Sequence, residues 1–66
     1  MTITVNGKPE EIRDRVSVEE FLRVKGLDRN RVAVEIDLEI IEKERYASRY
    51  IEAGSRLEIL HFVGGG

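Results

Sequence analysis

The chain closes on the stretch Arg56-Leu57-Glu58-Ile59-Leu60-His61-Phe62-Val63-Gly64-Gly65-Gly66, which contains its most apolar segment. Alternating side chains over residues 56–63 predict a strand. Because glycine has no Cβ, the run that follows predicts a thin, flexible tail over residues 64–66, able to enter a channel too narrow for other residues. We therefore expect the α-carboxylate of Gly66 to be the reactive group, and a partner enzyme to act on it.

The predicted strand also suggests how a partner binds. Successive side chains of a strand point to opposite faces. If Leu57 and Ile59 face the core, Glu58 marks the solvent face, and Leu60 and Phe62 share that face. Exposed apolar residues beside a reactive tail are typical of a docking surface. The alternative is that another loop covers them. The candidate partner-binding residues are Leu60, Phe62 and Val63.

Upstream of this strand, the chain alternates again over residues 31–36, which predicts a second strand. A short third strand follows at residues 39–41, after Asp37-Leu38. Residues 42–51 have mixed character and indicate a loop or a single helical turn, and residues 53–55 form a turn. The expected anchors of the mixed segment are Tyr46, Tyr50 and Ile51.

Further upstream lies the clearest helix signal of the sequence. Ser17-Val18-Glu19-Glu20 has the pattern of a capping box, in which the Ser17 hydroxyl accepts from the Glu20 N–H while the Glu20 side chain reaches back. Lys25 and Gly26 supply the C-cap, and Leu27 is expected to fold back onto the helix. The predicted helix covers residues 18–25, with Val18, Phe21 and Leu22 on its apolar face and Val16 and Phe21 as a hydrophobic staple.

The first residues predict a hairpin. Residues 2–6 alternate, Asn6-Gly7 is a strong signal for a two-residue turn, and the return strand covers about residues 8–13 with Ile12 its main buried residue. Pro9 has no N–H, so this return strand is expected at a sheet edge. A hairpin, one helix and further strands are most economically packed as a small mixed sheet with the helix across one face, which is an α+β fold.

Length and composition limit the function further. Sixty-six residues predict one domain. Thirteen acidic and eleven basic residues give a net charge of −2, and the basic residues are scattered, which argues against a nucleic-acid partner. Without cysteine there is no disulfide and no thiolate site. No apolar run approaches the roughly 20 residues of a membrane span, and no signal peptide is evident, so we expect a cytoplasmic protein without membrane contact.

The sequence offers little for catalysis by the chain itself. His61 is the single histidine and has no evident partner, so it is better interpreted as a strand residue than as a general base. The pairs Glu10-Glu11 and Glu19-Glu20 are adjacent and therefore point to different sides. Gly7 and Gly54 stand alone in turns, so no phosphate-binding loop is present. We predict no catalytic residue, no metal ligand, no bound cofactor and no ATP site.

Residues 50–66, with a turn glycine, an alternating strand and the ending Phe-Val-Gly-Gly-Gly, resemble the ThiS family, the sulfur carriers of thiamine biosynthesis. Residues 3–9, Ser17-Val18 and residues 32–35 also fit, so the resemblance covers essentially the whole chain. It implies the ubiquitin-like β-grasp fold. The chain departs from the family pattern at two places. Asp37-Leu38 stands where Asn-Gly is usual, and Glu42 and Tyr46 stand where Pro and Trp are typical.

The resemblance also implies a chemistry. A free α-carboxylate, with a pKa of about 3.5, is ionised and a poor electrophile, because a nucleophile must approach a negative charge and expel an oxide. Adenylation removes both obstacles, since the mixed anhydride has a neutral carbonyl and AMP as its leaving group. In the family, an E1-like adenylating enzyme uses ATP to activate the terminal glycine, and a sulfur donor converts the adenylate to a thiocarboxylate that serves thiazole synthase. By resemblance, Gly66 is the modified residue and Gly64 and Gly65 form the threading segment. The chain would be a carrier and not an enzyme, and a monomer when alone.

Other functions remain open at this point. A sulfur carrier for molybdopterin or cysteine synthesis would use the same tail with another partner. A non-covalent β-grasp adaptor would bind through its sheet and make no use of the tail. An isopeptide-forming protein modifier would join Gly66 to lysines of other proteins, and a glycine run can also be no more than a frayed terminus.

Overall fold

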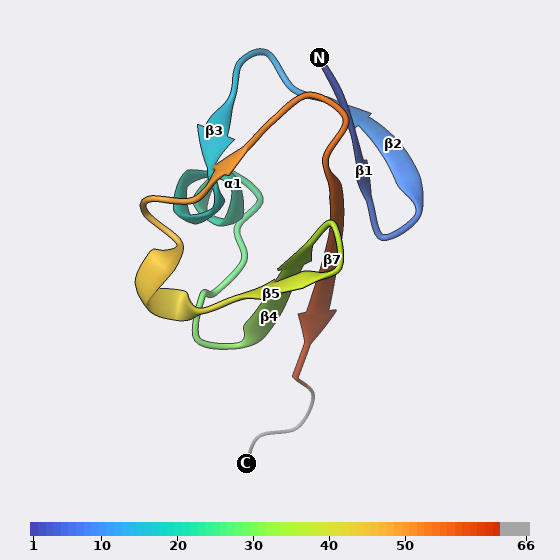
Figure 1. Cartoon of the computed structure of the whole chain (residues 1–66). Helices are drawn as coiled ribbons and strands as arrows, with labels where there is room; N and C mark the ends of the chain where they lie inside the picture. The colour runs from blue at the N-terminus through green and yellow to red at the C-terminus, as the bar shows by residue number, and fades with distance from the viewer. Residues whose placement is uncertain (63–66) are drawn as a thin grey trace.

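The structure, a computed structural model, describes residues 1–62. Over this range the chain forms an N-terminal hairpin, one α-helix, a 3-10 turn and a last long strand (Figure 1). In chain order the elements are β1 (Thr2–Val5), β2 (Lys8–Glu11), β3 (Val16–Ser17), α1 (Val18–Val24), β4 (Val32–Ile36), β5 (Glu39–Ile41), η1 (Lys43–Arg45), β6 (Tyr50–Ile51) and β7 (Arg56–His61).

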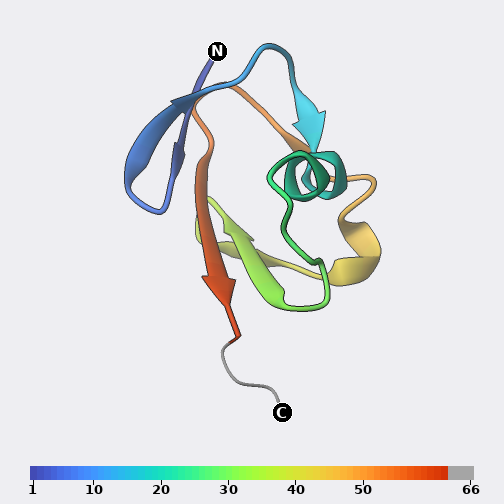
Figure 2. The ribbon, with the colours of Figure 1, turned by 180° about the vertical axis from the view of Figure 1, so that it is seen from behind.

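The main sheet has five strands in the order β2-β1-β7-β4-β5. β7 is central; it runs parallel to β1 and antiparallel to β4. β2, which contains Pro9, lies at one edge, as predicted. The two views show the β1–β2 hairpin on one side of β7 and α1 on the other (Figures 1 and 2). The predicted α+β arrangement of a small mixed sheet with one helix is therefore confirmed.

The core lies between α1 and one face of the sheet. The alternation predicted for β4 and β7 is confirmed for β4 and for the first part of β7, where Leu57 and Ile59 are buried and their neighbours are not. His61, the next residue of the inward-facing set in β7, is exposed. Tyr46 and Ile51 are buried anchors, as predicted. The buried hydrophobic residues are Ile3, Val18, Phe21, Leu22, Val32, Val34, Ile36, Ile41, Tyr46, Ile51, Leu57 and Ile59.

Tyr50 does not join this core, so its prediction as a buried anchor was wrong. Its side chain is exposed, and the guanidinium of Arg15 lies 4.4 Å from the ring centroid. The neighbouring residue Ile51 takes the buried position, because side chains alternate along β6.

Both ends of α1 follow the sequence signals closely. The Ser17 hydroxyl accepts from the Glu20 N–H at 3.0 Å. Gly26 has a φ of 73°, and the Leu27 N–H donates to the Leu22 carbonyl at 2.9 Å, so the helix ends in a Schellman motif with Leu27 folded back. One part of the capping prediction was wrong: the Glu20 carboxylate accepts from Arg23 instead of from Ser17.

A second ladder was not predicted. β3 and β6 pair antiparallel, with Val16 opposite Ile51, and the Val18 N–H donates to the Arg49 carbonyl at 2.9 Å. A strand of two residues is too short for alternation to appear in its sequence. This ladder ties the start of α1 to the segment that leads into β7.

The return strand of the hairpin is also shorter than predicted. β2 ends at Glu11, and Ile12 is only partly buried against the core. The last predicted strand is observed as β7 up to His61, and Val63 lies outside the described residues.

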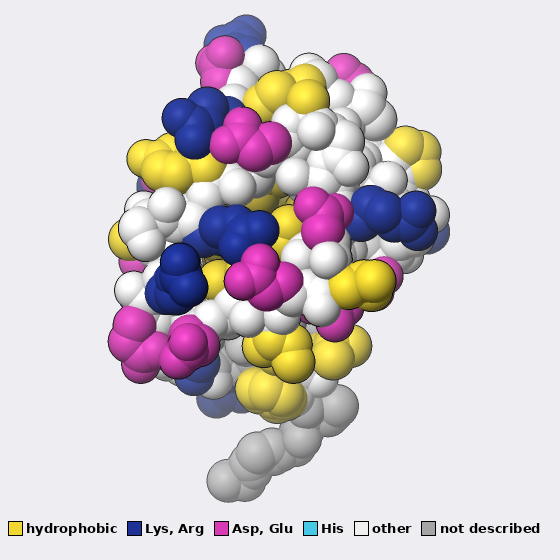
Figure 3. All heavy atoms as spheres, in the orientation of Figure 1, with side chains coloured by type: hydrophobic (Ala, Val, Ile, Leu, Met, Phe, Trp, Pro, Cys, Tyr) yellow, Lys and Arg dark blue, Asp and Glu magenta, His cyan; other side chains and the backbone are white. Residues whose placement is uncertain are grey.

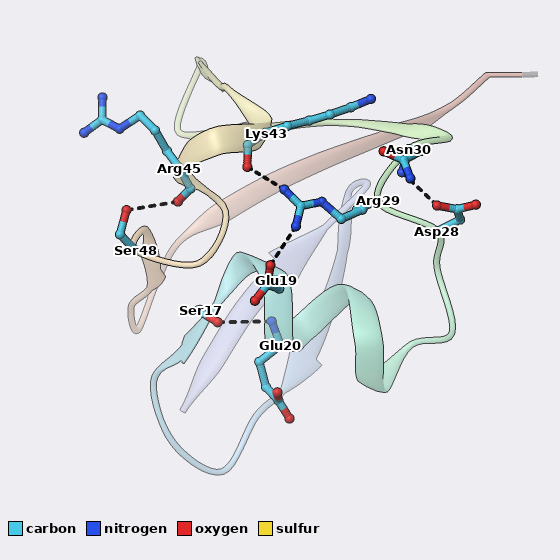
Figure 4. A network of polar contacts seen from close by, with 9 residues as sticks. All are labelled: Ser17, Glu19, Glu20, Asp28, Arg29, Asn30, Lys43, Arg45 and Ser48. Carbon is cyan, nitrogen blue, oxygen red and sulfur yellow. Dashed lines mark hydrogen bonds and ion pairs between the residues drawn. The ribbon is translucent and has the colours of Figure 1, made fainter.

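Arg29, in the loop after α1, makes contacts with both α1 and η1 (Figure 4). Its guanidinium donates to the Glu19 carboxylate at 2.8 Å and to the Lys43 carbonyl at 2.9 Å. It also lies 5.7 Å from the ring centroid of Tyr46. The contacts link α1 to η1 and cover the buried ring of Tyr46.

Candidate functional site

The candidate site is the end of β7. Leu60 is 63% exposed and Phe62 is 59% exposed, whereas Leu57 and Ile59, on the opposite face, are buried. The alternative that a loop covers the two apolar side chains is therefore wrong. Hydrophobic side chains gather at the bottom of Figure 3, where β7 ends in Figure 1, and charges of both signs are spread over the rest of that face.

The register of the sheet shows what borders this exposed apolar pair. Leu60 lies opposite Ala33 on β4. Farther from the end of β7, Glu58 lies opposite Glu35, and Glu35 lies opposite the exposed Ile40 on β5. The outer face of the sheet is thus apolar at the end of β7 and acidic toward its middle.

On its β4 side, β7 is held along its whole length. The pairing reaches from Ile36 opposite Leu57 to Val32 opposite His61. Beyond the last pair, the Phe62 N–H donates to the Arg31 carbonyl at 2.9 Å. Backbone hydrogen bonds on this side therefore continue up to the last described residue.

On the other side of β7, the pairing with β1 ends earlier, at Val5 opposite Leu57. Beyond this pair, the side chain of Asn6 makes the hydrogen bonds to β7 in place of the β1 backbone. The Asn6 Oδ1 atom accepts from the Ile59 N–H at 2.7 Å, and the Asn6 Nδ2 atom donates to the Ile59 carbonyl at 3.3 Å. The Asn6-Gly7 pattern predicts only a turn role for Asn6 and gives no sign of this contact with β7.

Asp37 makes a similar contact at the start of β7. Its Oδ1 atom accepts from the Arg56 N–H at 3.0 Å, and its N–H donates to the Arg56 carbonyl at 2.9 Å. Asn6 and Asp37 both have positive φ, at 51° and 50°, and each opens a two-residue turn. A short polar residue opening a tight turn beside a strand is the sequence signal that could have identified both contacts.

The carboxylates that the sequence singled out have structural partners. Glu19 binds Arg29, Glu20 binds Arg23, and Glu10 forms an ion pair with Lys25, so these adjacent carboxylates do not act together. His61 is exposed on β7. Within residues 1–62, no group of three or more acidic or histidine side chains could hold a metal ion. No helix in that range is long and apolar enough to cross a membrane.

Val63, the threading residues Gly64 and Gly65, and the modification site Gly66 lie outside the described residues. Their roles remain predictions. The described part of the site is the exposed pair of Leu60 and Phe62, together with the contacts that hold β7.

Comparison with known proteins identifies relatives over the whole chain. The Sulfur carrier protein ThiS of Bacillus subtilis (strain 168) is 37% identical over 65 residues, which cover 97% of this chain and 98% of that protein. A thiazole synthase of Paramagnetospirillum magneticum is 39% identical over 66 residues. The chain spans only 20% of the length of that synthase, and also 20% of a thiazole synthase of Magnetococcus marinus, which is 29% identical.

Two solved structures that resemble this chain are also of thiamine biosynthesis proteins. The crystal structure of the thiamine biosynthesis protein ThiS from Geobacter metallireducens superimposes with a TM-score of 0.86, at 33% identity and with full coverage of both chains. A solution structure of a thiamine biosynthesis protein from the same organism gives a TM-score of 0.83. The predicted ubiquitin-like β-grasp fold is therefore confirmed. Because the model of the ThiS family matches residues 3–66, the chain belongs to the ThiS family.

Proposed function

We propose that this protein is a sulfur carrier for thiazole formation in thiamine biosynthesis, and that it carries the sulfur as a thiocarboxylate on Gly66. The observation that carries the proposal is the family match, which extends to residue 66 and so includes the three glycines. The exposed Leu60 and Phe62 support it, since they give a partner enzyme an apolar surface next to those glycines. The chain acts as a substrate of its partners and not as a catalyst.

The loading reaction follows from carboxylate chemistry. An oxygen of the Gly66 carboxylate attacks the α-phosphorus of ATP, and pyrophosphate leaves. The resulting acyl adenylate has a neutral carbonyl and AMP as its leaving group, so it accepts a nucleophile that the free carboxylate would repel. Hydrosulfide then attacks the carbonyl carbon, AMP departs, and the thiocarboxylate remains. ATP binds to the E1-like adenylating partner, which supplies the catalytic groups.

Partner docking is assigned to Leu60, Phe62 and Val63, with Gly64 and Gly65 threading into the active site of the partner. Glycine suits this role because a segment without side chains enters the narrowest channel. Apolar contacts next to the threading segment would supply binding energy without obstructing the carboxylate. The same surface serves the adenylating enzyme and, later, thiazole synthase.

The comparison with thiazole synthases supports the choice of acceptor. Two such enzymes contain a region similar to this whole chain that makes up a fifth of their length. A carrier joined to the synthase in one polypeptide would deliver sulfur at high effective concentration. We infer that the separate chain makes the equivalent contact by association.

The loading step is tested by intact-mass spectrometry. The protein is incubated with an E1-like adenylating enzyme of its own organism, ATP and sodium sulfide. The expected gain equals the mass difference between one sulfur and one oxygen atom. A variant lacking Gly65 and Gly66 should keep its circular dichroism spectrum and gain nothing. An unchanged wild-type mass, under conditions that load the Bacillus subtilis carrier with its own enzyme, would contradict the proposal.

The pathway is tested by the second step. Loaded protein is mixed with thiazole synthase and its other substrates, and thiazole product is measured. Carriers for molybdopterin or cysteine synthesis would load in the same way but would not support this step. A non-covalent adaptor would show neither the mass gain nor the dependence on Gly65 and Gly66.

A further inference from the structure

We propose that Asn6 is a positioning residue for the reactive end of the chain. Its side-chain amide takes the place of the residue that β1 lacks beside Ile59, and so fixes the orientation of the last part of β7, where Leu60 and Phe62 lie. This inference rests on the proposed function, because it concerns presentation of Gly66 to the adenylating enzyme.

The first step of the argument is the hydrogen-bond pattern between β1 and β7. The Thr4 N–H donates to the Ser55 carbonyl at 2.9 Å, and the Asn6 N–H donates to the Leu57 carbonyl at 2.8 Å. Backbone groups of every second residue of a strand face the same neighbour. Ile59 is therefore the next residue whose N–H and C=O face β1. However, β1 ends at Val5, and the chain turns away at Asn6-Gly7.

The second step is that the Asn6 side chain fills the vacant place in the ladder. The side-chain carboxamide of asparagine has a carbonyl oxygen that accepts and an NH₂ group that donates. Both lie in one plane, so the group can make the same two hydrogen bonds as a backbone peptide group. Oδ1 accepts from the Ile59 N–H at 2.7 Å, and Nδ2 donates to the Ile59 carbonyl at 3.3 Å. Ile59 is only 8% exposed, so an unsatisfied backbone group there would be poorly solvated. Asn6 thus extends the pairing of β7 on its β1 side.

The third step concerns location. Ile59 is flanked in sequence by the exposed Leu60, and Phe62 follows shortly after. On the β4 side, the bonds of β7 continue to the Phe62 N–H. Without Asn6, this last part of β7 would be held by β4 alone and could pivot about that edge. With Asn6, both neighbours hold Ile59, so the exposed Leu60 and Phe62 have one orientation. Asn6 itself need not touch the partner.

The test uses two variants at this position. Asn6→Gly keeps a residue that tolerates positive φ and removes the side chain. Asn6→Asp keeps the acceptor of the shorter bond but loses the donor. Adenylation is followed by pyrophosphate release with ATP, the E1-like enzyme and increasing carrier concentration. We expect Asn6→Gly to raise KM for the carrier about tenfold with kcat little changed, and Asn6→Asp to lie between Asn6→Gly and wild type.

Asp37→Gly is the matched control. It removes a similar side-chain bond to β7, but at Arg56, the end away from the docking residues. It should lower stability as Asn6→Gly does and leave KM within about twofold of wild type. Amide hydrogen exchange gives a second readout, since exchange at Ile59 should accelerate in Asn6→Gly and not in Asp37→Gly.

The outcomes distinguish failure of the positioning role of Asn6 from failure of the proposed function. A wild-type KM in Asn6→Gly, with normal adenylation throughout, would overturn the role of Asn6 and leave the proposed function standing. An equal rise of KM in Asp37→Gly would also overturn it, because general loss of stability would then explain the effect. Failure of the wild type to be adenylated would refute the proposed function and this role together. If Asn6→Gly does not fold, Asn6→Asp still decides, with wild-type KM as the contradicting result.

Discussion

Glu58 on β7 lies directly opposite Glu35 on β4, on the face of the sheet that α1 leaves uncovered. Neither carboxylate takes part in an ion pair among the described residues. Two like charges at directly opposite positions of a sheet repel each other and lower stability. The protein therefore retains an unfavourable pair next to its candidate docking surface.

The first prediction follows from this pair. Glu58→Gln should raise the free energy of unfolding by about 0.2–1 kcal/mol at low salt, because the cross-strand repulsion is lost. The gain should shrink at high salt, since exposed charges are screened. Urea unfolding at two salt concentrations measures it, with Glu44→Gln, on the exposed surface of η1, as the control. An equal gain in the control would assign the effect to net charge and not to the pair.

The second prediction concerns the turn between β4 and β5. Leu38 has a φ of 72° and is 90% exposed, so a bulky side chain occupies a left-handed conformation without compensating burial. Leu38→Gly should stabilise the fold by about 1 kcal/mol. Thermal unfolding measures the change. Leu38→Ala is the control, because it removes the exposed side chain and keeps the strain. Stabilisation by alanine as large as that by glycine would argue against backbone strain as the cause.

The third prediction concerns alkaline pH. Tyr46 is 1% exposed, and burial raises its pKa above the ordinary 10.0, although the Val34 backbone and the Arg29 charge act in the opposite direction. In the unfolded chain the phenol ionises near its ordinary pKa, whereas in the folded protein it stays protonated to a higher pH. The unfolded state therefore releases the proton first, and stability falls as the pH rises above 10.

Tyr46→Phe should remove this part of the pH dependence. Chemical unfolding of wild type and variant between pH 7 and pH 11 gives the difference in their unfolding free energies. We expect a constant difference up to about pH 9 and a shift in favour of the variant above about pH 10. A difference that stays constant across the whole range would show that the phenol has the same pKa in both states.

The fourth prediction tests the docking surface. Replacing Leu60 and Phe62 together by serine should weaken adenylation at limiting carrier concentration by at least about tenfold, because the partner loses apolar contacts near the centre of the interface. Stability should change little, since both side chains are exposed. Val24→Ser is the control, as Val24 is an apolar residue at least as exposed but lies on α1. The surface assignment is wrong if the double variant is adenylated with wild-type kinetics.

Several elements could be predicted because their determinants are local. The alternation of Val32, Val34 and Ile36 identifies β4 and its buried face. Ser17 and Gly26 delimit α1, because caps satisfy the backbone groups of the same helix. The exposure of Leu60 and Phe62 followed from the same alternation once Glu58 was placed on the solvent face.

Other features depend on where distant segments lie and were therefore missed. β3 and β6 have two residues each, so only tertiary packing defines them. The bond from Asn6 to Ile59 joins residues far apart in sequence, and it exists because β7 runs parallel to β1 past the point where β1 ends. The turn at Asp37-Leu38 keeps its tight geometry despite its departure from Asn-Gly, since Asp37 bonds to the backbone of β7.

The central claim is that Gly66 carries sulfur, and fragmentation mass spectrometry of protein loaded with isotopically labelled sulfide tests it most directly. The adenylating enzyme, ATP and labelled sulfide are supplied, and the carboxyl-terminal fragment ions are sequenced. The account predicts one labelled sulfur atom, confined to Gly66 and absent when ATP is omitted. Label on any other residue, or a Gly66 fragment of unchanged mass in a reaction that consumes ATP, would contradict it.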